Sequence, residues 1–105
     1  MMVKDQKRAF VDFYNSARKN KVLEPKTTLM IHLASAMALG CYPWMDHYLG
    51  VAKEEGLSDD EISTVQAIVM AVAAGKVNAQ FREVRSKTEN QSQPGMCSPQ
   101  KDLVY

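Results

Sequence analysis

The stretch KTTLMIHLASAMALGCYPWMDHYLG, residues 26–50, consists of two largely apolar segments joined at a glycine and a cysteine. Pro25 stands directly before it and suits the first turn of a helix, because its missing N–H would have no partner there. Gly40 is the residue type that most often follows the end of a helix. A second proline three residues later again fits a first turn. We therefore expect one helix over 25–39 and another over 43–55.

The 25–39 helix is apolar on nearly all sides. Its nonpolar residues are Leu29, Met30, Ile31, Leu33, Ala34, Ala36, Met37, Ala38 and Leu39. A helix without a polar face must be covered all round. A chain of 105 residues buries only a modest fraction of its surface, so we expect another subunit to supply part of that cover. The run is interrupted by His32 and is shorter than the roughly 20 residues that span a bilayer, which indicates a buried helix.

A further helix is expected before this stretch, over residues 4–19. Phe10, Phe13, Tyr14 and Ala17 recur there at helical spacing, with lysine and arginine on the other side. This pattern is typical of an amphipathic helix.

A helix start is encoded in the segment GLSDDEI. Ser58 can cap the following helix, and Glu61, three residues later, can reach back to the Ser58 N–H. Leu57 and Ile62 are placed to form a hydrophobic staple across the same turn. We therefore expect a helix over 59–74.

Two apolar stripes follow the predicted cap. The 59–74 helix is expected to bury Ile62, Val65, Ile68, Val69 and Val72. Gly75 is expected to interrupt it, and KVNAQFREVRSK then predicts a fifth helix with inward residues Val77, Phe81 and Val84. No segment shows the β-branched alternation of a strand, so the fold class is all-α, with about five helices.

The chain ends in a polar segment rich in proline and serine, and we expect a helical domain over 1–89 and a flexible tail over 90–105. The net charge is only +1 and the basic residues form no stripe, which argues against nucleic acid or a membrane as partner. The first residues lack the apolar stretch of a signal peptide, so we expect a cytoplasmic protein. Cys41 and Cys97 lie far apart in sequence, and a structural disulfide is not expected in that compartment.

Several of these segments taken together resemble a known family. KTTLMIHLASAMALGC, AKEEGLSDDEI and AIVMAVAAGK are similar to the carboxymuconolactone decarboxylase family, including its alkyl hydroperoxidase D-like branch, over about residues 22–82. The resemblance implies a homo-oligomer, a trimer or a hexamer. For the redox branch it implies a peroxiredoxin-type antioxidant activity, the reduction of alkyl hydroperoxides, without a bound cofactor.

The redox branch uses a glutamate, a Cys-x-x-Cys pair and a histidine. Carried over position by position, the first cysteine falls on Cys41, the second on Trp44, the histidine on Tyr48 and the glutamate on Leu29. A tryptophan can neither attack a peroxide nor form a disulfide. We therefore expect the dithiol and most of the proton relay to be lost, with His47 one position away from the family histidine.

The candidate catalytic residues are Cys41, His32 and His47. At the start of a helix, the dipole would favour the Cys41 thiolate, and either histidine could replace the missing base. The alternative interpretation makes Cys41 a small buried residue, His32 a hydrogen-bonded core histidine and His47 a surface or interface residue. These side chains and Asp46 have no recognised metal-binding spacing, so no metal is expected. Leu29, Trp44 and Tyr48 are expected to line or fill the old site.

The decarboxylase branch, by resemblance, acts on a small lactone acid without a dithiol. Its active-site histidine also falls in the region of Tyr48, and no arginine lies within 22–81 to hold a substrate carboxylate. Three functions therefore stay open: a peroxidase-like enzyme using Cys41, a non-redox binding or structural oligomer, and a decarboxylase-like enzyme. A peroxide or another small molecule is the expected ligand.

Overall fold

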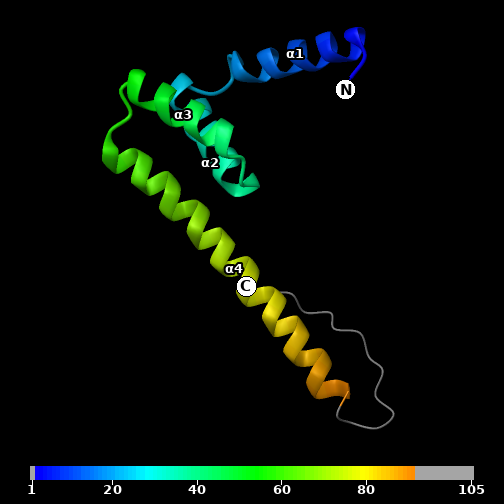
Figure 1. Ribbon diagram of the computed structural model, residues 1–105. Helices are drawn as coiled ribbons and strands as arrows, with labels where there is room; N and C mark the ends of the chain where they lie inside the picture. Colours follow the sequence, from blue (N-terminus) through cyan, green and yellow to red (C-terminus); the bar gives the residue numbers. More distant parts are fainter. Residues whose placement is uncertain (1, 92–105) are drawn as a thin grey trace. The chain divides into compact units, whose positions relative to one another are not determined.

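Four helices make up the part of the chain that the computed structural model describes, residues 2–91 (Figure 1). They are α1 (Lys4–Arg18), α2 (Pro25–Leu39), α3 (Tyr42–Glu54) and α4 (Asp59–Gln91), and these residues contain no strand. The all-α fold class is confirmed over this range. Most of the expected tail, including Cys97, lies outside the described residues, but its first two residues, Asn90 and Gln91, belong to α4.

The chain divides into two compact units within α4. The first unit covers Met1–Val65 and contains α1, α2, α3 and the start of α4. The second covers Gln66–Tyr105, and its described residues are the rest of α4.

The turn between α2 and α3 is built as the sequence predicts. Gly40 adopts the left-handed conformation, with φ of 68°, which a residue with a side chain adopts only with strain. The Gly40 N–H donates to the Met37 carbonyl at 3.2 Å, and the Cys41 N–H donates to the Ala36 carbonyl at 3.1 Å. These two bonds satisfy two of the last four carbonyls of α2, and the chain then turns directly into α3. Pro25 and Pro43 both lie in first turns, as expected.

The core of the first unit lies between α2 and α3. Its buried residues come from α2, from α3, from the turn before α4 and from the start of α4: Leu29, Leu33, Ala36, Tyr48, Ala52, Leu57 and Val65. Other apolar side chains of α2 stay exposed, notably Ile31 and Leu39. The described residues therefore cover α2 on one side only. That another subunit covers the rest of α2 stays a prediction.

The predicted cap of α4 is confirmed. The Glu61 N–H donates to Ser58 Oγ at 3.0 Å, and the Ser58 N–H donates to Glu61 Oε1 at 2.8 Å. Leu57 is buried, and Ile62 packs against the same core cluster. The capping box and the hydrophobic staple together fix where α4 begins.

The prediction of a helix break at Gly75 is wrong, because α4 runs through it without interruption. A glycine inside a helix costs about 1 kcal/mol relative to alanine, which the neighbouring helix-forming residues can outweigh. The number of helices is therefore four in the described residues, one fewer than expected.

The expected burial along α4 is also largely wrong. Val65 is buried, and Ile62 and Val69 are half-buried. The remaining residues of both predicted stripes are exposed: Ile68, Val72, Val77, Phe81 and Val84. A helix buries its apolar side chains only where another element packs against them. Periodicity predicts an apolar face but does not identify the element that covers it.

By its length and composition alone, α4 is long and apolar enough to cross a membrane. The core helices of soluble proteins can have the same length and composition.

Helix α1 shows the same difference between pattern and burial. It contains no buried residue, and Phe10 and Phe13 of its apolar face are exposed. Tyr14 is half-buried. Tyr14 is therefore the residue of the apolar face of α1 that packs against the core of the first unit.

Candidate functional site

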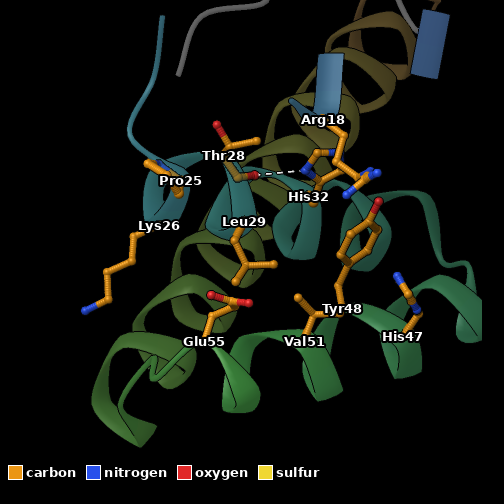
Figure 2. A pocket seen from close by; sticks show the side chains of 10 residues that line it. All are labelled: Arg18, Pro25, Lys26, Thr28, Leu29, His32, His47, Tyr48, Val51 and Glu55. Atoms are coloured by element: carbon orange, nitrogen blue, oxygen red, sulfur yellow. Dashed lines mark hydrogen bonds between the residues drawn. The ribbon is translucent and has the colours of Figure 1, made fainter. Parts of the chain in front are cut away.

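The first unit contains a cavity of about 300 Å³ to which α1, α2 and α3 all contribute (Figure 2). Its lining residues are Arg18, Pro25, Lys26, Thr28, Leu29, His32, His47, Tyr48, Val51 and Glu55. Figure 2 shows Arg18, His32, Tyr48 and His47 toward one side, with Lys26 toward the other. The two histidines and the arginine thus lie together, and Glu55, the acidic residue of the lining, lies apart from them.

His32 is held by a hydrogen bond along α2. Its Nδ1 lies 3.0 Å from the Thr28 carbonyl oxygen, one turn earlier in the helix. A carbonyl oxygen can only accept, so we assign the proton to Nδ1 as the donor. The other ring nitrogen, Nε2, is then the atom of His32 that can exchange a proton with a ligand.

Tyr48 is the centre of a cluster of aromatic rings. It is buried, and its hydroxyl is hydrogen-bonded to the hydroxyl of Tyr14 in α1. The Tyr48 ring is stacked on His32 at 4.7 Å between centroids and on Trp44 at 5.5 Å, and His47 meets it edge-on at 4.9 Å. These contacts and the bond to Thr28 orient His32, whereas His47 is exposed and meets Tyr48 and Trp44 edge-on.

The Tyr14 hydroxyl is protonated at neutral pH. Burial raises the pKa of the Tyr14 hydroxyl, and the nearby Arg18 guanidinium opposes that shift in pKa. Arg18 is therefore close enough for its charge to act on Tyr14, and its Nη2 lies 3.4 Å from Asn15 Oδ1. Lys26 is instead paired with Glu61, at 3.4 Å between Nζ and Oε2. Arg18 is the cation of the cavity that is best placed to meet an anionic ligand.

A second, more open hollow of about 550 Å³ adjoins the first. It is lined by Tyr14, Asn15, Arg18, Pro43, Trp44 and His47. Arg18 and His47 line both spaces, so the two hollows share part of one wall.

The sequence matches the carboxymuconolactone decarboxylase family over residues 5–85, which is more than half of the chain. The chain belongs to the carboxymuconolactone decarboxylase family. The match confirms the family but does not distinguish its branches. No curated protein and no solved structure shows significant similarity to the chain. The matched range extends into α1, so Tyr14 and Arg18 lie inside the carboxymuconolactone decarboxylase domain.

Most of the residues singled out in the sequence gather at these hollows. Leu29, His32, His47 and Tyr48 line the first, and Trp44 and His47 line the second. Within residues 2–91, no group of three histidine, cysteine, aspartate or glutamate side chains is placed to hold a metal ion.

Cys41 does not line either hollow. It is the half-buried residue before the first turn of α3, and its carbonyl accepts the Met45 N–H at 2.9 Å. Its thiol caps no backbone group of that turn. The two histidines proposed as bases for Cys41 are thus found in the hollows, whereas Cys41 is not.

The residue that the sequence argument missed is Arg18. The resemblance to the family begins at about residue 22, and Arg18 lies just before it, outside the 22–81 range that contains no arginine. A usable signal was present, because Arg18 is an exception to the expected pattern of basic residues opposite the aromatic face. It lies four residues after Tyr14 and therefore on the same face of the helix. When the aromatic residue packs inward, an arginine on the same face of the helix lies close to the same contact.

Proposed function

We propose that this carboxymuconolactone decarboxylase family member binds a small carboxylic acid in the cavity between α1, α2 and α3. It acts on that acid by proton transfer and does not use Cys41. The observation that carries the proposal is the meeting of Arg18 with His32, His47 and Tyr48 in one cavity (Figure 2).

The charge and size of the cavity support a small acid as ligand. A guanidinium group offers two parallel N–H donors that match the two oxygens of a carboxylate. A volume of about 300 Å³ is at the lower end of the range for small-molecule sites. Leu29 and Val51 supply apolar wall inside this cavity.

The reaction suited to this site is one of the decarboxylase type. When an unsaturated lactone acid loses CO₂, the bond between carboxyl carbon and ring breaks and its electron pair moves toward the lactone carbonyl. A proton is then added to carbon. Histidine is the side chain that most readily exchanges a proton near neutral pH, and here two histidines lie against Tyr48. Arg18 orients the acid, and His32 or His47 moves the proton.

Reduction of alkyl hydroperoxides, implied by the redox branch, is the weaker candidate. It needs a thiol within reach of a base and of the peroxide, and Cys41 lines neither hollow with His32 or His47. The proposed loss of the dithiol, with Trp44 at the place of the second cysteine, points the same way.

One comparison separates the two reactions. The wild type and Cys41→Ser are assayed for CO₂ release from carboxymuconolactone and for consumption of an alkyl hydroperoxide. We expect Cys41→Ser to leave CO₂ release unchanged, and the wild-type thiol to react no faster than a free thiol in an unfolded peptide. Hydroperoxide consumption that disappears in Cys41→Ser would contradict the proposal. Ligand binding without CO₂ release would indicate a binding protein that keeps the fold.

We also propose that copies of the chain assemble with each other through α4. Met70, Val77, Phe81 and Val84 are exposed and recur at intervals of seven, four and three residues, which places them on one face of the helix. In the described part of the chain nothing covers this face. The family resemblance implies a trimer or a hexamer, and this stripe is the surface that would be buried in it.

A further inference from the structure

Trp44 is held in place yet remains accessible. One face of its indole is stacked on Tyr48, with 18° between the ring planes, and its other ring neighbours are Tyr14 and His47. Even so, 42% of the Trp44 surface is exposed. An aromatic side chain fixed by its neighbours has little conformational entropy left to lose when a ligand covers the rest of it.

The exposed part of Trp44 faces the second hollow, which has a cation at its boundary with the first. Arg18 lines both spaces, so an acid whose carboxylate meets Arg18 can place its body against Trp44. Asn15 and His47 are the other polar residues of that hollow, and Tyr14, Pro43 and Trp44 supply flat, largely apolar surface. The second hollow thus combines one positive group with flat apolar walls.

We propose, on the basis of the carboxylic acid site proposed above, that Trp44 selects acids that carry a flat conjugated ring. The carboxylate meets Arg18, and the ring stacks on the accessible surface of the Trp44 indole. Offset stacking between aromatic rings adds to the burial of their area. A saturated ring of the same size cannot lie flat on the indole, so it gains only the free energy of burying its apolar area. The expected preference is roughly three- to tenfold in affinity.

Two acids with the same charge and the same number of carbons test this directly. Benzoate has a flat ring, and cyclohexanecarboxylate has a puckered one. Trp44 is the only tryptophan of the chain, so its fluorescence reports on this hollow without labelling. For the wild type we expect tighter binding of benzoate by calorimetry and a change in Trp44 fluorescence that saturates at the same benzoate concentration.

The variants Trp44→Leu and Trp44→Phe separate stacking from folding. Trp44→Leu is expected to lose the preference for benzoate while its affinity for cyclohexanecarboxylate stays within about twofold. Trp44→Phe is expected to keep most of the preference, because a phenyl ring still stacks. Tyr42→Leu is the matched control, since Tyr42 is an exposed aromatic residue two positions away that lines neither hollow.

The possible failures are distinguishable. If the wild type binds both acids equally, or if Trp44→Leu keeps the preference, stacking on Trp44 is overturned and the carboxylic acid site stands. If neither acid binds, or if replacing Arg18 with glutamine changes neither affinity, the carboxylic acid site itself is overturned, and the role of Trp44 with it.

Discussion

The hydroxyl of Tyr48 in α3 is hydrogen-bonded to the hydroxyl of Tyr14 in α1. Tyr48 is buried in the core, whereas α1 contributes no buried residue at all. This bond, with the ring contacts of Tyr14 to His32 and Trp44, therefore orients α1 against the rest of the first unit. It also fixes Arg18, one turn after Tyr14, at the cavity.

Tyr14→Phe and Tyr48→Phe are each expected to lower the free energy of unfolding by about 1–2 kcal/mol, because each leaves one hydroxyl without its partner. The double variant is expected to cost less than the sum of the two single variants, since it removes both groups at once. Urea unfolding of the four proteins measures the coupling. Strictly additive costs would show that the two hydroxyls do not stabilise each other.

Two glycines are expected to respond in opposite directions to alanine. Gly40 is in the left-handed conformation, so Gly40→Ala is expected to destabilise the chain by about 1 kcal/mol. Gly50 lies inside α3 with a negative φ, and a Cβ there would meet no atom within 4 Å, so Gly50→Ala is expected to stabilise by about 0.5–1 kcal/mol. The thermal unfolding midpoints of the two variants show whether each substitution lowers or raises stability. The same sign for both variants would contradict the observed backbone.

The capping box makes stability depend on pH. The hydrogen bond from the Ser58 N–H is the main cause that lowers the pKa of the Glu61 carboxyl. A carboxyl with a lowered pKa in the folded state stabilises the fold above its ordinary value of about 4.3. That contribution is lost as the pH falls through the folded-state pKa.

Glu61→Gln is therefore expected to be less stable than the wild type at neutral pH, with a difference that shrinks below pH 4. Glu54→Gln, which removes a carboxylate from an exposed position in α3, is the control for the loss of one negative charge. Denaturant unfolding at a series of pH values measures the difference in stability between the wild type and each variant. A constant difference between the wild type and Glu61→Gln across that range would contradict the ionised cap.

A charged substitution tests whether the exposed apolar stripe on α4 is the surface through which copies of the chain assemble. Phe81→Glu is expected to reduce the molar mass of the assembly in solution, because burying an unpaired carboxylate in an apolar interface is costly. Gln80→Glu adds the same charge at the preceding position, which is also exposed, and is expected to leave the molar mass unchanged. Sedimentation equilibrium measures both. An assembly unaffected by Phe81→Glu would exclude this stripe as the interface.

The helix boundaries were predictable because their signals are local. Pro25, Gly40 and the Ser58–Glu61 pair act within one turn of the chain, and each is found as expected. Gly75 was misread since the cost of one glycine does not by itself end a helix. Burial of Val77 and Phe81 depends on what packs against α4, and periodicity identifies an apolar face without identifying its partner.

The candidate site was predictable in part. His32, His47 and Tyr48 were found from their spacing and from the family resemblance, and they do meet at one cavity. Arg18 was not found, because its place at the cavity depends on how α1 packs, through Tyr14, against α3. The sequence placed Cys41 at the start of a helix, but the separation of Cys41 from the hollows is a three-dimensional property.

The most direct test of the proposed site is a calorimetric titration of the wild type, Arg18→Gln and Lys19→Gln with benzoate. Lys19 is the neighbouring exposed cation and lines neither hollow. We predict that Arg18→Gln binds benzoate roughly tenfold more weakly, as expected for the loss of a charge-assisted hydrogen bond, and that Lys19→Gln binds it as the wild type does. Equal affinities for all three proteins would contradict the account.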